Sequence, residues 1–197
     1  MTPTIARIAI VWGLLLAGFL GIAQLATALF GTAYALDRHV FTAVLTSAVT
    51  VPIILLARRH LDREPVAGLG LGFDTAAVKA LLVGAFAWLG PFLLGLGLCL
   101  GLGLVKVTPV AGWGEIIAFV PLLAGLVFLL EALPEELAFR GYLQAILARL
   151  AAPWLAIAIQ AVLFGSWAVA LWLITTGSVD PAHASLFYVM GAVLGML

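Results

Sequence analysis

The segment 131–142, EALPEELAFRGY, places three carboxylates and one guanidinium between two apolar runs, at a spacing that could support chemistry. Within a membrane a charged side chain costs at least about 2.5 kcal/mol, so its presence indicates a cavity, a partner or a reaction. Glu136 and Arg140 are four residues apart and can form an ion pair on one helix face. Glu135 points about 100° away from Glu136. A carboxylate there, without an evident cation partner, is suited to be a general base for water.

The helix that carries these charges is expected to begin at Pro134. Proline is tolerated in the first turn of a helix, where its missing N–H is not needed. We therefore expect Pro134 to separate the preceding apolar helix from a new helix with Glu135 and Glu136 at its N-terminus, where the helix dipole favours carboxylates. The plain alternative is that these are loop charges solvated by water, and the pattern alone does not decide between the two.

The composition of the chain predicts an integral membrane protein. Of its 197 residues, 65% are hydrophobic and 9% are charged, whereas soluble domains carry about 25% charged residues. A span needs about 20 apolar residues, so the length allows six or seven spans and no soluble domain. We expect an all-α, polytopic membrane helical bundle that forms a single domain over residues 1–197, with the lipid bilayer as a partner. The formal net charge of zero argues against a nucleic-acid partner.

The apolar runs predict where the helices lie. The first run exceeds the core of a secretory signal, despite the small-residue pattern at 33–35, so we interpret it as a retained span. The last segment is too short to cross a bilayer comfortably, and we expect it to be incomplete. The predicted segments are 8–30, 40–57, 76–105 with a kink or break at Pro91, 116–133, a shorter helix over 135–150, 154–175, and a last segment from about 184.

Basic residues give the expected orientation of these spans. Arg58, Arg59, Arg63 and Lys79 lie between the second and third segments, whereas the neighbouring turns carry one basic residue each. The positive-inside rule therefore predicts that this loop and the N-terminus are cytoplasmic.

The sequence EELAFRGYL resembles the first signature of the CAAX prenyl protease and bacteriocin-processing family, which comprises multi-span membrane endopeptidases. The upstream sequence GLGLGFDTAAVKALLVG is similar to that family's lead-in to its third span, so the resemblance covers about residue 60 to the end. It implies an intramembrane metalloprotease-type hydrolase of the bacterial plasma membrane. Such an enzyme would cut a membrane-associated protein or peptide near the cytoplasmic face.

The resemblance also implies roles for individual residues. Glu135 matches the family's water-activating glutamate, and Glu136 and Arg140 match its supporting acid–base pair. The second signature, Phe-x-x-x-His, aligns with Phe164, but Ala168 stands where the histidine is expected. The neighbouring Trp167 could line the site, although packing is the preferred interpretation.

A third signature, His followed four residues later by Asn or Asp, is not found, because Phe187 follows His183 at that spacing. A catalytic zinc normally has three protein ligands. Glu135 is the candidate metal ligand here, and we expect a divalent metal such as zinc in an intact relative rather than in this chain. Ala168 and the missing signature together predict slow or absent cleavage.

Two other functions remain open. A non-catalytic membrane protein on the same scaffold, acting as an adaptor or in bacteriocin immunity, is favoured by Ala168 and the missing third signature. A small transporter could use Glu131, Glu135 and Arg140 in an ion path. Transporters often carry internal repeats, however, and the sequence holds no second Glu/Arg cluster to match the first.

Overall fold

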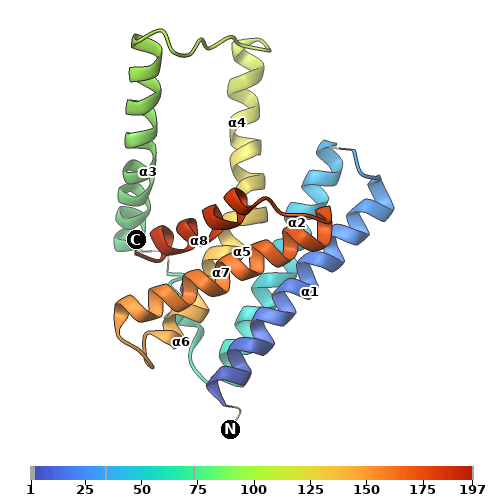
Figure 1. Cartoon of the computed structure of the whole chain (residues 1–197), viewed down its shortest axis with the longest axis vertical. Helices are drawn as coiled ribbons and strands as arrows, with labels where there is room; N and C mark the ends of the chain where they lie inside the picture. Colours follow the sequence, from blue (N-terminus) through green and yellow to red (C-terminus); the bar gives the residue numbers. More distant parts are fainter. Residues whose placement is uncertain (1–2, 34, 73, 197) are drawn as a thin grey trace. The chain divides into compact units, whose positions relative to one another are not determined.

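The computed structural model describes residues 3–33, 35–72 and 74–196, and every regular element among them is a helix (Figure 1). Five of these helices are long and apolar enough to cross a membrane. The predicted all-α, polytopic membrane fold is therefore confirmed. The chain divides into two compact units, residues 1–70 with 123–197 and residues 71–122, and each is described by itself. The prediction of a single domain over residues 1–197 stays a prediction.

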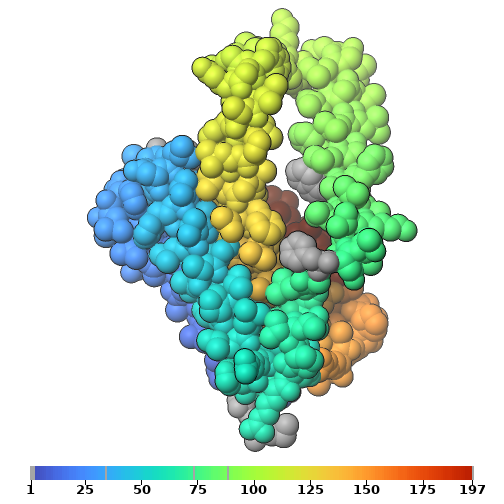
Figure 2. Space-filling view, turned by 180° about the vertical axis from the view of Figure 1, so that it is seen from behind, coloured from blue at the N-terminus to red at the C-terminus, as the bar shows by residue number. Residues whose placement is uncertain are grey.

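The first unit is built from two pairs of helices and the charged helical segment between them. The first pair packs side by side, as Figures 1 and 2 show in blue and cyan. The second pair, at the C-terminal end, also packs side by side. The elements are α1 (Thr4–Phe30), α2 (Leu36–Leu56), the π-helical turn η1 (Ala57–Leu61), the 3₁₀ turn η2 (Val66–Leu69), α7 (Pro153–Thr176) and α8 (Pro181–Met196).

The charged segment lies within one continuous helical run, Trp113–Leu147. The prediction that Pro134 separates two helices is wrong, and the glutamates do not lie at a helix N-terminus. This merger is also why the described residues contain five long apolar helices and the shorter α8, instead of six or seven spans. The run comprises α4 (Trp113–Val127), the π-helix η3 (Phe128–Ala132), α5 (Leu133–Glu135), the π-helix η4 (Glu136–Gln144) and α6 (Ala145–Leu147).

The helix continues through Pro134 because its backbone polar groups find other partners. In η3 the N–H of Leu133 donates to the carbonyl of Phe128, five residues back. With the same five-residue spacing, the carbonyl of Leu129 would accept a hydrogen bond from the backbone N–H of residue 134. Residue 134 is a proline, however, and has no N–H. The hydroxyl of Ser47 on α2 donates to the Leu129 carbonyl instead. A serine on a neighbouring helix thus satisfies the group that proline leaves free, as membrane helices require.

The second unit consists of α3 (Thr75–Gly101) and the part of α4 up to residue 122. The side chain of Asp74 caps α3 by accepting a 2.7 Å hydrogen bond from the backbone N–H of Ala77. The helix continues through Pro91 without the break that was considered for this position. None of the described side chains of α3 is buried, which fits a helix surrounded by lipid.

Glycines allow α7 and α8 to approach closely. A Cβ atom on Gly191 would lie 3.0 Å from the Cα of Ala161, and one on Gly165 would lie 2.2 Å from the ring of Tyr188. A Cβ on Gly195 would lie 2.8 Å from the amide oxygen of Gln160. The Gly191-xxx-Gly195 pair is therefore a helix contact of the small-residue type. A Cβ on Gly97 or Gly101 would meet no described atom within 4 Å.

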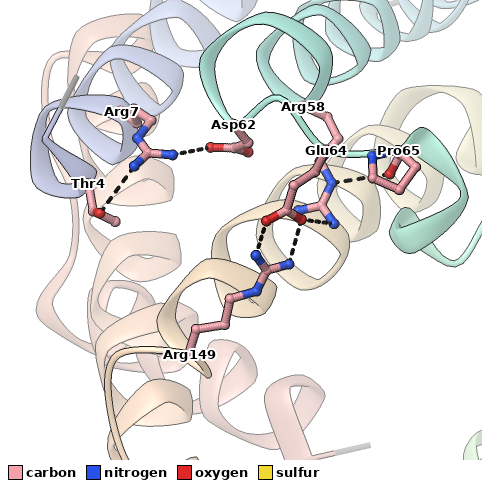
Figure 3. A network of polar contacts seen from close by, with 7 residues as sticks. All are labelled: Thr4, Arg7, Arg58, Asp62, Glu64, Pro65 and Arg149. Carbon is pink, nitrogen blue, oxygen red and sulfur yellow. Dashed lines mark hydrogen bonds and ion pairs between the residues drawn. The ribbon is translucent and has the colours of Figure 1, made fainter. Parts of the chain in front are cut away.

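Charged residues join the ends of three helical elements in the first unit (Figure 3). Arg7 of α1 pairs with Asp62 at 2.9 Å. Glu64 pairs with the buried Arg58 at 2.6 Å, and both of its oxygens accept from Arg149, which follows α6. The network ties the end of α2 to the end of the helical run that carries Glu135. The cytoplasmic location of this end stays a prediction.

The Ser47 hydrogen bond yields a prediction about stability. Replacing Ser47, which is buried, with alanine removes the hydrogen bond that its hydroxyl donates to the Leu129 carbonyl. We expect Ser47→Ala to lower the free energy of unfolding by about 1–3 kcal/mol, measured by denaturant titration in detergent micelles. The control is Ser185→Ala, because Ser185 is exposed and bonds only within its own helix. Equal stability of the two variants would contradict this role of Ser47.

The Glu64 network yields a prediction about pH. The hydrogen bond from Arg149, and then the charge of Arg58, lower the pKa of Glu64 below its ordinary value of 4.5. A lowered pKa in the folded state stabilises the fold above pH 4.5, and this contribution is lost as the pH falls through the folded-state value.

We therefore expect Glu64→Gln to lower the free energy of unfolding by about 1–2 kcal/mol at pH 7, since half-exposed pairs contribute modestly. The difference from the parent should vanish well below pH 4.5. Denaturant titrations from pH 3 to 8 measure it. The exposed Glu115, replaced in Glu115→Gln, is the control. A pH-independent difference for Glu64→Gln would refute the electrostatic origin.

Candidate active site

A cavity of about 450 Å³ lies within the first unit. Its lining is mostly apolar and aromatic, with two carboxylates and three threonines. Such a concave, largely apolar site with a few polar groups is typical of ligand and substrate sites. The lining residues are Phe19 and Ala23 of α1, Thr42 and Thr46 of α2, Leu130, Glu131 and Glu135 of the charged run, Phe164, Trp167, Ala168, Leu171, Trp172 and Thr175 of α7, and Phe187 and Met190 of α8.

Three of the residues singled out in the sequence meet at this cavity. Glu135 comes from α5, whereas Phe164 and Ala168 come from α7, yet all three line the same space. The catalytic and supporting roles that the resemblance implies for these three residues stay predictions. Ala168 is 8% exposed and adds only a methyl group, so the cavity extends where a larger side chain could lie.

Glu136 and Arg140 form the expected pair but do not line the cavity. Their nearest atoms, Glu136 Oε1 and Arg140 Nη1, are 3.2 Å apart. The Glu136 side chain is 51% exposed within the protein and that of Arg140 only 13%. The guanidinium also stacks 5.0 Å from the ring centroid of Phe164, a cation–π contact. Arg140 thus joins the glutamate-bearing helix to α7.

The Arg140 contact with Glu136 is electrostatic rather than a well-formed hydrogen bond. The distance qualifies as an ion pair, but none of the three guanidinium nitrogens has a hydrogen-bond partner of good geometry among the described residues. The pair therefore supports the helix mainly through charge and through the stacking on Phe164. Glu135, by contrast, lines the cavity and forms no ion pair with any of the described residues.

Aromatic rings pack together where α1, η4 and α7 meet, and several of them line the cavity. Trp167 packs edge-on against Phe19 with ring centroids 4.8 Å apart, and lies 5.4 Å from Phe139 of η4. Phe139 in turn meets Phe164 edge-on at 5.1 Å. These contacts join α1, η4 and α7 in one rigid cluster. Trp167 therefore packs, as preferred from the sequence, and also lines the cavity.

The described residues around the cavity do not match a zinc site. Two carboxylates, Glu131 and Glu135, line the cavity, and no histidine or cysteine lines it. Among the described residues no three His, Cys, Asp or Glu side chains are grouped so that they could hold a metal. A catalytic zinc needs three protein ligands and an open position. Glu135 as a metal ligand stays a prediction, and no chemical step below depends on a metal.

Sequence reasoning considered Glu131 only for an ion path, and it assigned no role to several other residues that line the cavity. Glu131 lies four residues before Glu135, a spacing that places both on one face and could have indicated their common cavity. Phe19, Thr46 and Met190 lie far away in sequence, and no local pattern points to them. His183 is exposed, pairs with Asp180 at 3.5 Å and stacks on Trp172, which does line the cavity.

The fold and the site together define a polytopic membrane protein with a carboxylate-bearing cavity among its helices. Residues 117–197 match the family described as Rce1-like, type II CAAX prenyl endopeptidase Rce1-like. The match agrees, for this part of the chain, with the sequence resemblance to CAAX-protease-type membrane endopeptidases. The matched segment includes the cavity residues from Glu131 to Met190. It begins later than residue 60, where the sequence resemblance was expected to start. Neither a curated protein nor a solved structure matches the chain.

The space beside Ala168 yields a prediction. A histidine at position 168 would extend into the cavity toward carboxylates that can accept from it, so we expect Ala168→His to change the free energy of unfolding by less than about 1 kcal/mol. Ala161, on the same helix, is equally buried, but its backbone contacts Gly191. Ala161→His should therefore cost about 1–3 kcal/mol or more through overpacking. Thermal unfolding in micelles compares the stabilities of the two variants. An equal loss of stability in both would show that the cavity does not accept a histidine at position 168.

Proposed function

We propose that this protein has the scaffold of an intramembrane endopeptidase, which hydrolyses a peptide bond in a membrane-associated protein or peptide. The observation that carries the proposal is the meeting of Glu135, Phe164 and Ala168 at one largely apolar cavity within a segment that matches the Rce1-like family. An apolar cavity between helices suits an apolar peptide, and a carboxylate inside it suits the activation of water.

The proposed chemistry uses Glu135 as general base and then as general acid. Glu135 accepts a proton from a water molecule, whose oxygen forms a bond to the carbonyl carbon of the substrate. The protonated Glu135 returns that proton to the departing nitrogen as the carbon–nitrogen bond breaks, which leaves a carboxylic acid and an amine. Glu136 and Arg140 position the helix that carries Glu135, because they pair with each other and Arg140 stacks on Phe164.

Ala168 limits this chemistry. A methyl group can neither orient the attacking water nor stabilise the negative charge that develops on the carbonyl oxygen, and such stabilisation is a large part of catalysis by acyl-transfer enzymes. We therefore propose that this form cleaves slowly or not at all. The same observation favours a second candidate, a non-catalytic adaptor or bacteriocin-immunity protein that binds a membrane peptide in the cavity without cutting it.

Cleavage in a defined bilayer tests the proposal. We would compare the parent chain with Ala168→His, with a chain extended by a helix that carries His-x-x-x-Asn, with both changes, and with both changes plus Glu135→Gln. The readout is release of a labelled fragment from membrane-anchored peptides. We expect the doubly changed chain to cut fastest, and Glu135→Gln to lower its rate by about 10²–10⁴-fold, the usual contribution of a general base.

The control for Glu135 is Glu131→Gln in the doubly changed chain, since Glu131 lines the same cavity but has no assigned proton transfer. We expect a much smaller loss of rate for this variant. Equal loss for the two glutamates would contradict the role of Glu135. Peptide binding by folded chains with no cleavage by any of them would favour the adaptor.

A further inference from the structure

A basic hollow lies at the surface of the first unit, where the helix that contains α2 ends. Its volume is about 410 Å³, and two arginine side chains line it, one from the π-helical turn η1 and one from the loop that follows. Both arginines are exposed, and neither side chain forms an ion pair with any of the described residues. The lining residues of this basic hollow are Arg59, Arg63, Glu64, Pro65 and Val66.

The carboxylate of Glu64 does not neutralise these two arginines, because it is already bound to two other cations. It pairs with the buried Arg58 at 2.6 Å, and both of its oxygens accept hydrogen bonds from Arg149 (Figure 3). Arg58 also donates through its Nε to the carbonyl of Pro65 at 3.4 Å, so a buried positive charge contacts two of the lining residues. The basic hollow therefore has an excess of positive charge and suits an anionic ligand.

Arg63 has a backbone conformation that is unfavourable for a residue with a side chain. Its φ is 58°, in the left-handed region that glycine usually occupies after a helix. The backbone N–H groups on both sides of it are bonded, that of Asp62 to the carbonyl of Ala57 and that of Glu64 to the carbonyl of Arg58, each at 3.1 Å. An exposed arginine at a position suited to glycine indicates a role for its side chain.

The basic hollow lies where lipid headgroups are expected. The membrane-spanning run that contains α2 covers Leu36–Leu61, so Arg59 lies in its last turn and Arg63 follows its end. A polar headgroup layer borders the hydrocarbon core at this depth. Arginine binds phosphate through parallel N–H bonds, and basic pockets at the ends of membrane helices suit anionic headgroups. We infer that the basic hollow binds the phosphate group of an anionic phospholipid, with Arg59 and Arg63 as its ligands.

This lipid site is separate from the candidate active site, and the inference does not rest on the proposed function. None of the residues that line the basic hollow lines the cavity that holds Glu135. Glu64 is shared by the hollow and the charged network, which reaches Arg149 after α6. A lipid bound here therefore contacts the network that holds the C-terminal end of the glutamate-bearing helix.

Native mass spectrometry of the full chain in detergent micelles tests the inference. The chain is titrated with the anionic lipid dioleoylphosphatidylglycerol and with dioleoylphosphatidylcholine, whose phosphate is balanced by a cation in the same headgroup. We expect the parent to bind the anionic lipid more tightly. Arg59→Gln and Arg63→Gly should each bind it about fivefold more weakly, and the double variant about twenty- to thirtyfold more weakly, the usual contribution of an arginine near an anionic surface.

Lys79→Gln is the matched control for a general effect of surface charge. Lys79 is exposed and predicted on the same side of the membrane, but it does not line the basic hollow. We expect this variant to bind the anionic lipid less than about twofold more weakly than the parent. Equal weakening by Lys79→Gln and Arg59→Gln would overturn the assignment of a specific site.

Arg63→Gly also separates lipid binding from folding. Glycine suits a φ of 58°, and the side chain that it removes is exposed, so we expect this variant to unfold at no lower temperature than the parent while it binds the anionic lipid more weakly. A much lower unfolding temperature would overturn the assignment of Arg63 as a lipid ligand, since its side chain would then hold the fold.

A further arm distinguishes a lipid from free phosphate. Inorganic phosphate should displace the anionic lipid only at concentrations far above that of the lipid, because the acyl chains hold the lipid headgroup next to the basic hollow. Tighter binding of inorganic phosphate than of the lipid would overturn the lipid as the ligand. Equal affinity of the parent for the two lipids, or equal affinity of the parent and the folded double variant for the anionic lipid, would overturn the site itself.

Discussion

The candidate site depends on how a proline is accommodated in the middle of a long apolar helix. Pro134 lacks an N–H, and the carbonyl of Leu129 would be stranded if α2 did not supply the hydroxyl of Ser47. The helix continues through the proline from η3 into η4, and this bond supplies a donor to the Leu129 carbonyl there. Glu131, Glu135 and the Glu136–Arg140 pair then share a single rigid element. The cavity has its carboxylates on one wall because that element does not break.

Two further sets of contacts hold this helix against the rest of the unit. Glu64 connects its C-terminal end to α2 through Arg58 and Arg149. The aromatic cluster and the stacking of Arg140 on Phe164 connect its middle to α7. The charged contacts lie at the end of the unit and the aromatic ones at its centre. This arrangement follows from the cost of placing charges among apolar groups, which is lowest where water is near.

Composition was sufficient to predict an all-α membrane fold, because so few charged residues cannot cover a soluble surface. The ends of α1 and α7 also lie close to the predicted ones, since long apolar runs are unambiguous. The helix boundary at Pro134 could not be predicted, because local rules for proline do not include a serine on another helix. The spacing did indicate that Glu136 and Arg140 pair. Which carboxylates face the cavity, however, depends on the packing of α1, α2 and α8, and local spacing does not contain that information.

The glycine contacts between α7 and α8 have a consequence for the environment of the site. Phe187 and Met190 of α8 form part of the cavity wall, and α8 approaches α7 closely at Gly191, beside the backbone of Ala161, and at Gly195, beside the side chain of Gln160. Association of this kind competes with lipid tails for the same helix surface, so its strength depends on the solvation offered by the bilayer. The stability of this pocket is therefore expected to depend on the acyl chains of the surrounding lipids, much as the stability of a soluble enzyme depends on temperature or ionic strength.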